Sequence, residues 1–183
     1  MKKVIGITGS IGSGKSYAIE NFKKLCQNKN IKTFFIDVDD VRRNILAEEN
    51  IDRIELNKKI YNDNKEMEKY KRFINPKIKK YLMEQIKQND GFIFIEWALL
   101  IEDDLYDIVD SVIMLYCNEE IQIKRLENGD LGKAEIIKRM NLQLTNEQKI
   151  EKIKQLNKEY YIIDTSNNPS IDQYENILKK EGL

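Results

Sequence analysis

The chain has 183 residues, which is enough for one α/β domain with a buried core and too few for two ordinary domains. Its 31 lysine and arginine residues balance 31 aspartate and glutamate residues, so the formal net charge of zero gives no overall attraction to nucleic acid or an anionic membrane. The sequence contains no histidine, which excludes Ser-His-Asp and Cys-His hydrolases and leaves carboxylates, lysines and arginines for catalysis.

No apolar run approaches the roughly 20 residues that span a membrane, and the start MKKVIGITGS lacks the long apolar region and the small-residue cleavage site that are typical of a signal peptide. Cys26 and Cys117 lie far apart and form no C-x-x-C pair, which suits a reducing compartment. We therefore expect a soluble, cytoplasmic protein with no nucleic-acid or membrane partner, either a monomer or a weak homo-oligomer.

Five short segments rich in β-branched and aromatic residues alternate with longer, charged stretches of helical periodicity. In chain order, the predicted strands span residues 2–8, 32–37, 91–96, 111–117 and 160–164. The run from Phe92 to Ile95 is continuously apolar, which is typical of strands that helices cover on both faces. The pattern predicts a three-layer α/β fold with a five-stranded, mostly parallel sheet, and ligands at the carboxyl ends of the strands.

Two long charged stretches interrupt this single predicted domain, residues 1–183. The predicted core comprises 1–40, 90–117 and 159–183. Residues 41–89 are interpreted as a helical insert over the substrate side, and 118–158 as a lid followed by a long helix. Gly129 and Gly132 are the expected hinge of that lid.

The segment after the first strand, Gly9-Ser10-Ile11-Gly12-Ser13-Gly14-Lys15-Ser16, matches the phosphate-loop pattern G-x-x-x-x-G-K-[ST] and precedes a helical stretch. Glycines allow successive amides to point at a β-phosphate, the lysine reaches β and γ oxygens, and the Ser16 hydroxyl can ligate Mg²⁺. The alternative is a glycine-rich turn with a surface lysine. The loop therefore predicts binding of a nucleoside triphosphate with Mg²⁺ and defines a P-loop fold.

Three acids follow predicted strands that end at the same edge of the sheet. Asp37 ends the second strand, Asp39 lies two residues further on, and Glu96 ends the third strand. Asp39 is the candidate general base for an acceptor hydroxyl, and Glu96 resembles a Walker B acid that holds a Mg²⁺-bound water. Helix capping by either aspartate and a solvated strand-end glutamate are the competing interpretations.

A series of motifs, taken in order, resembles the dephospho-coenzyme A kinase family over most of the chain. The matching segments are ITGSIGSGKS, FIDVDDVRR, DRIELNKKIYND, FINPKI, IEWALLIE, NEEIQIKRL and KRMNLQ. The resemblance implies a P-loop kinase that uses ATP to phosphorylate the ribose 3′-hydroxyl of dephospho-CoA, the last step of coenzyme A synthesis.

The resemblance also assigns roles to residues at matching positions. It makes Asp39 and Lys15 the catalytic pair, and it implies that the 165–167 loop lies beside the adenine. The expected ATP-binding residues are Gly9, Ile11, Gly12, Ser13, Gly14, Lys15, Ser16, Tyr17, Arg139 and Thr165. The expected substrate-binding residues are Asp37, Arg53, Glu96 and Leu99, and the expected metal-site residues are Ser16 and Glu96.

The chain departs from the family pattern at four of these motifs. Asn75 replaces a histidine, Ala98 a proline, Tyr17 a threonine and Gly129 a lid arginine, for which Lys133 is a candidate replacement cation. Two other functions share the same phosphate loop. One is a nucleoside or nucleotide kinase, and the other is a P-loop protein that binds ATP without transferring phosphate.

Overall fold

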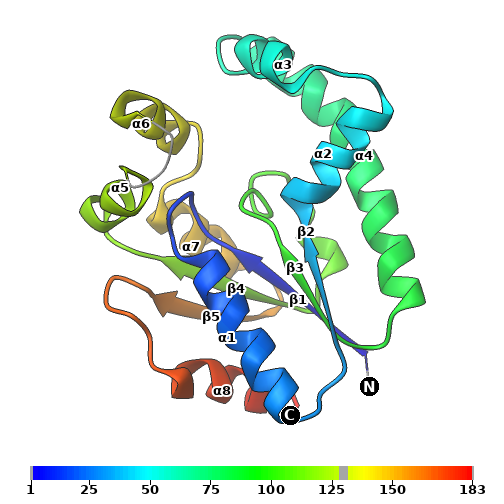
Figure 1. Cartoon of the computed structure of the whole chain (residues 1–183), viewed down its shortest axis with the longest axis vertical. Coiled ribbons are helices and arrows are strands. Elements are labelled where there is room, and N and C mark those ends of the chain that lie inside the picture. Colours follow the sequence, from blue (N-terminus) through cyan, green and yellow to red (C-terminus); the bar gives the residue numbers. More distant parts are fainter. Residues whose placement is uncertain (1, 128–131, 183) are drawn as a thin grey trace.

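Five strands form one sheet in the computed structural model, which describes residues 2–127 and 132–182 and the side chains of those residues except 133–135 (Figure 1). In order across the sheet, β2-β3-β1-β4-β5, every pairing between neighbours is parallel. The strands are β1 (Lys2–Thr8), β2 (Thr33–Asp37), β3 (Gly91–Glu96), β4 (Ser111–Tyr116) and β5 (Glu159–Asp164). The predicted α/β fold is confirmed, and each strand boundary lies within one residue of its prediction.

Helices cover both faces of the sheet, which explains why its central strands are apolar at almost every position. On one face, Ile5 and Phe94 pack with α1 (Lys15–Asn28) and α8 (Ile171–Lys180). On the other face, Val4 and Ile93 pack with residues of α2, α4 and α7. The first strand-to-helix turn therefore emerges at the carboxyl edge of a sheet that is buried on both sides.

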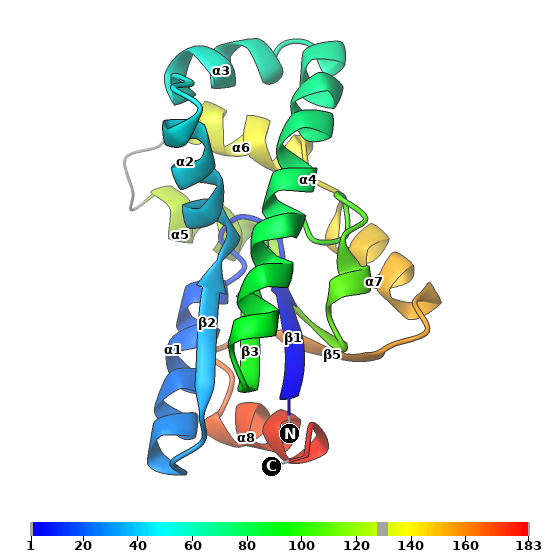
Figure 2. The ribbon, with the colours of Figure 1, turned by 90° about the vertical axis from the view of Figure 1, so that its right-hand side faces the viewer.

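The stretch between β2 and β3 contains α2 (Val38–Glu48), α3 (Arg53–Ile60) and α4 (Asn64–Gln88). Each helix begins at an aspartate whose side chain accepts amide hydrogen bonds, Asp37, Asp52 and Asp63 in turn. The later part of α4 packs on the sheet through Ile74, Ile78 and Leu82. Its first turns extend beyond the strand ends together with α3 (Figure 2). These helices form one wall above the carboxyl edge of the sheet.

The stretch between β4 and β5 contains α5 (Glu119–Glu127), α6 (Lys133–Asn141) and α7 (Asn146–Gln155). The prediction of one long helix here is wrong, because residues 142–145 separate α6 from α7 and Thr145 begins α7 with a capping box. Of the expected hinge, Gly132 is the N-cap of α6, and Gly129 lies outside the described residues. The side chain of Lys133 also lies outside the description.

Besides these elements, a short 3₁₀ helix, Tyr106–Ile108, precedes β4. Within the described residues, no helix combines the length and the apolar character that crossing a membrane requires.

Candidate active site

The loop between β1 and α1 has the backbone conformation of an anion-binding turn. Gly12 and Gly14 have φ values of 76° and 89°, a region that glycine enters without steric cost. Gly14 is also the N-cap of α1 and contributes no side-chain hydrogen bond to the first turn of the helix. The amides of that turn are therefore free of a side-chain cap, and the positive end of the helix dipole favours an anion here.

Two glutamines from distant parts of the chain hold the tip of this loop. The Ile11 amide donates at 3.0 Å to Oε1 of Gln143, which lies between α6 and α7. The Ile11 carbonyl accepts from Nε2 of Gln122, a buried residue of α5. Because both backbone groups of one loop residue are fixed by side chains, the loop is positioned by the 119–155 stretch as well as by β1 and α1.

The other half of the loop is held from α5 and from the end of β5. Arg125 donates to the carbonyl of Gly12 at 3.3 Å and to the carbonyl of Thr165 at 2.6 Å. The Thr165 hydroxyl lies 2.8 Å from the Ser13 carbonyl, and its side chain is buried. Thr165 therefore holds the loop from the end of β5 through hydrogen bonds, and its assignment to the nucleotide stays a prediction.

Lys15 lies inside the loop. Its ammonium donates to the carbonyls of Gly9 at 3.0 Å and Ser10 at 3.2 Å. Burial lowers the pKa of Lys15, and the nearby carboxylates Glu96, Asp39 and Asp37 oppose that shift. A triphosphate would provide the same ammonium with anionic oxygens in place of two neutral carbonyls, which is a stronger hydrogen-bonding environment.

The three predicted acids occupy different positions around Lys15. Asp37 caps α2 by accepting the Asp39 amide at 2.7 Å, so the capping interpretation applies to Asp37. Asp39 has an exposed side chain at the start of α2. Glu96 is partly buried at the end of β3, and burial raises its pKa while Lys15 opposes the rise. Glu96 and Asp37 line a cavity of about 350 Å³ together with Ser16.

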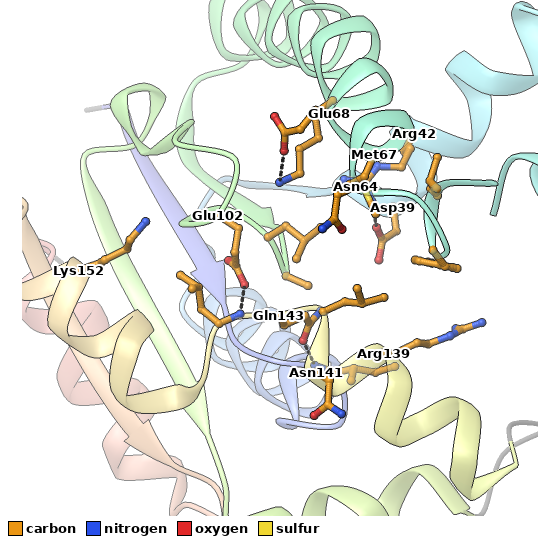
Figure 3. Close-up of a pocket in the computed structure, with 18 of the residues that line it drawn as sticks. Asp39, Arg42, Asn64, Met67, Glu68, Glu102, Arg139, Asn141, Gln143 and Lys152 are labelled. Carbon is orange, nitrogen blue, oxygen red and sulfur yellow. Dashed lines mark hydrogen bonds and ion pairs between the residues drawn. The ribbon is translucent and has the colours of Figure 1, made fainter. Parts of the chain in front are cut away.

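A larger cavity of about 650 Å³ lies between the loop and the helices above the sheet (Figure 3). Its walls come from the phosphate loop, α2, α3, α4, the turn after β3 and the α6–α7 region. Five of the predicted site residues line it: Ile11, Lys15, Asp39, Leu99 and Arg139. The cavity therefore brings together the candidate base, the phosphate-loop lysine and a basic residue of α6.

Tyr17 and Arg53 are two predicted site residues that line neither of these cavities. Tyr17 is 50% exposed on α1, and the side chain of Arg53 is exposed at the first position of α3. The α3 residue that lines the cavity is Ile60, two turns further along the helix or about 10 Å away. The resemblance to the family motif assigned Arg53 to the substrate, and that assignment stays a prediction.

Sequence reasoning missed a buried ion pair beside the site. Lys149 of α7 is fully buried, and its Nζ lies 2.7 Å from Glu102 Oε1 and donates to the Ala98 carbonyl at 2.9 Å. Glu102 also accepts the Leu144 amide at 3.2 Å, at the break between α6 and α7. The Lys149–Glu102 ion pair therefore links α7 to the turn after β3. Lys149 lies in a run of charged residues, and no local signal separates it from its exposed neighbours.

Replacing Lys149 with methionine is expected to lower the free energy of unfolding by about 3–5 kcal/mol, because Glu102 would remain as a buried carboxylate without its cation. Urea unfolding followed by circular dichroism measures the loss. Lys152→Met is the control, since Lys152 is exposed on the same helix. Equal midpoints for the two variants would contradict the assignment, whereas adding Glu102→Gln to Lys149→Met should recover part of the loss.

The donor set around Ser16 fits a magnesium ion that arrives with a nucleotide. Mg²⁺ prefers oxygen ligands and is usually held by one or two carboxylates plus substrate phosphates. A hydroxyl and the Asp37 and Glu96 carboxylates line the cavity at Ser16. Across the described part of the chain, no group of three or more acidic, cysteine or histidine side chains forms a metal site by itself.

Comparisons with a family model and with curated proteins point to the same family. Residues 38–160, more than half of the chain, match the model of the family described as Dephospho-CoA kinase. The Dephospho-CoA kinase of Clostridium tetani is 32% identical over 189 residues, covering 89% of this chain and 78% of that protein. The Dephospho-CoA kinase of Listeria monocytogenes is 28% identical over 177 residues, covering 83% and 86% of the two chains.

Solved structures share the fold. TT1252 from Thermus thermophilus superposes with a TM-score of 0.79 at 20% identity, covering 98% of this chain and 96% of that one. Shikimate kinase from Acinetobacter baumannii superposes with a TM-score of 0.59 at 14% identity, covering 99% and 93%. The fold of this chain is thus shared with both solved structures.

Proposed function

The chain belongs to the dephospho-CoA kinase family, and on this premise we propose that it transfers the γ-phosphoryl group of ATP to the ribose 3′-hydroxyl of dephospho-CoA. The products are coenzyme A and ADP, so the reaction completes coenzyme A synthesis. The observation that carries the proposal is the cavity that Lys15 and Asp39 both line on this family's scaffold.

On the nucleotide side, the residues of the loop bind and orient the triphosphate. The uncapped amides at the start of α1 face the β-phosphate, and Lys15 exchanges the Gly9 and Ser10 carbonyls for β and γ oxygens. Arg139, which lines the cavity from α6, is positioned to neutralise charge on the transferred group. The loop is already braced by Gln122 and Gln143, so little reorganisation is needed at the moment of transfer.

On the acceptor side, Asp39 binds the hydroxyl and accepts its proton. One carboxylate oxygen of Asp39 contacts Arg42, and the side chain is 62% exposed toward solvent and the cavity that it lines. In-line attack requires the hydroxyl between this carboxylate and the γ-phosphate, and fixing both reactants in that order supplies much of the rate acceleration. The cavity volume of about 650 Å³ is within the range that encloses a molecule of nucleotide size.

We propose that Mg²⁺ accompanies the ATP and is held by Ser16, with Glu96 and Asp37 nearby. When bound there, the ion would supply positive charge that offsets the negative charge developing on the phosphate oxygens during transfer. Burial raises the pKa of Glu96, so a cation beside it would favour its charged form.

The test is a coupled assay of ADP release. We expect release that requires both MgATP and dephospho-CoA, and phosphate incorporated at the 3′ position of the product. Release with nucleosides or mononucleotides in place of dephospho-CoA would assign the protein to another kinase class. Tight ATP binding without turnover of any acceptor would identify a nucleotide-binding protein.

A further inference from the structure

The side chain of Arg42 lies between two carboxylates that come from different parts of the chain. On α2, its Nη1 is 3.4 Å from Oδ1 of Asp39, three residues earlier. Its Nη2 is 3.8 Å from Oδ2 of Asp103, in the turn after β3. The side chains of Asp39, Arg42 and Asp103 are 62%, 20% and 1% exposed, so the contacts run from the open cavity into the protein interior.

Asp103 is fixed at the buried end of this series. The indole Nε1 of Trp97 donates to Oδ2 of Asp103 at 3.1 Å, and the Asp103 amide donates to the Leu99 carbonyl at 2.8 Å. Burial raises the pKa of Asp103, and Arg42 is the strongest of the groups that oppose the rise. A carboxylate with this much burial needs a nearby cation, so Asp103 and Arg42 depend on each other.

Asp39, the exposed carboxylate that contacts Arg42, needs a partner that fixes its orientation. Asp39 is on the first turn of α2, and an exposed aspartate on a helix surface samples several rotamers. The guanidinium group of arginine is planar and presents its donors in fixed directions. Because Asp103 holds Arg42, the contact with Arg42 restricts the rotamers that the Asp39 carboxylate can adopt. The contact uses Oδ1 of Asp39 and leaves Oδ2 for another donor.

We propose that Arg42 is a positioning residue for phosphoryl transfer. It is held by Asp103, which Trp97 fixes in turn, and it orients Asp39 so that one oxygen of the Asp39 carboxylate is presented to the acceptor hydroxyl. The proposal rests on the proposed function, because it assigns Asp39 the acceptor proton. Asp103 and Trp97 act only through Arg42 and touch neither substrate. Nothing in the matched motifs distinguishes Arg42 from the other arginines of the chain, and only its two partners do.

The first test is a double-mutant cycle on kcat. Arg42→Met is expected to lower kcat about 10- to 100-fold with the KM for ATP within twofold, since misplacing a catalytic group by about 1 Å costs this much. Asp103→Asn should lower kcat several-fold in the wild-type background and have no further effect in Arg42→Met, because residues that act through one another are not additive. Arg42→Lys should restore activity only in part.

The control is Arg43→Met. Arg43 is the next residue of α2 and makes an equivalent ion pair with Asp40, three residues earlier, but does not line the cavity. Its loss should leave kcat within twofold. The proposal is overturned if Asp103→Asn has the same effect in both backgrounds, or if Arg42→Met raises the KM for dephospho-CoA and leaves kcat unchanged. The second result would make Arg42 a direct contact of the acceptor.

A second measurement does not depend on turnover. Trp97 is the single tryptophan of the chain, so its indole N–H gives one resonance in a ¹H–¹⁵N spectrum of the labelled protein. Asp103→Asn, Arg42→Met and Asp39→Asn should each shift that resonance, and Arg43→Met should not.

Failure of the proposed function can be told apart from failure of this inference. If the wild type releases no ADP with dephospho-CoA, the proposed function is wrong. If the chemical shift of the indole resonance is unchanged in both Arg42→Met and Asp39→Asn, the proposed positioning of Asp39 through Arg42 is overturned, whatever the acceptor is.

Discussion

Replacing Lys15 with alanine is expected to lower kcat by about 10³-fold or more. Lys15 is the one phosphate-loop side chain that carries a full positive charge, and we propose that β and γ oxygens of ATP replace its Gly9 and Ser10 carbonyl partners. Without it, the charge that spreads over the transferred group loses a buried ammonium, for which water is a poor substitute.

The fold should tolerate this change. Burial lowers the pKa of Lys15, which means that the folded protein does not favour its charge, and alanine removes a desolvated ammonium. We expect a midpoint of thermal unfolding close to that of the wild type, with weaker binding of a fluorescent ATP analogue. Lys24→Ala, on the exposed side of α1, is the control and should keep full activity. Turnover of Lys15→Ala within tenfold of the wild type would show that the loop does not bind the transferred phosphate.

Replacing Asp39 with asparagine is expected to lower kcat by about 10²- to 10⁴-fold, the range that general-base catalysis contributes. Asparagine keeps the size of the side chain and can still accept a hydrogen bond from Arg42, but it cannot take the proton of the acceptor hydroxyl. The KM for ATP should stay within about twofold, because the nucleotide is held by the phosphate loop on the other side of the transferred group.

Another acid of the same helix gives the matched control. Glu48 is the last residue of α2, its side chain is exposed, and it lines neither of the two cavities. Glu48→Gln should therefore leave kcat unchanged, and steady-state kinetics of the two variants with saturating ATP measure the difference. Near-normal turnover of Asp39→Asn would remove Asp39 from the catalytic role and leave Glu96 as the acid to test.

The fold was largely predictable because its signals are local. A central strand buried on both faces must be apolar at consecutive positions, and the runs at Ile5 and at Phe92–Ile95 show this directly. The phosphate loop is equally local, since the glycines that need positive φ and the lysine all fall within one turn. The break between α6 and α7 was missed because residues 142–145, Leu-Gln-Leu-Thr, contain no glycine or proline to mark it. There the Leu144 amide donates to Glu102, in the turn after β3.

What the sequence determined by itself was the sheet, the phosphate-binding turn and the candidate base at the end of the second strand. Only the tertiary structure decided that Gln143 and Gln122 hold that turn, that Lys149 is buried, and that Arg42 joins Asp39 to Asp103. Those partners lie far apart along the chain, except for Asp39 and Arg42. Periodicity and spacing describe the backbone within one element, whereas burial and pairing of a charged side chain depend on which distant element packs against it.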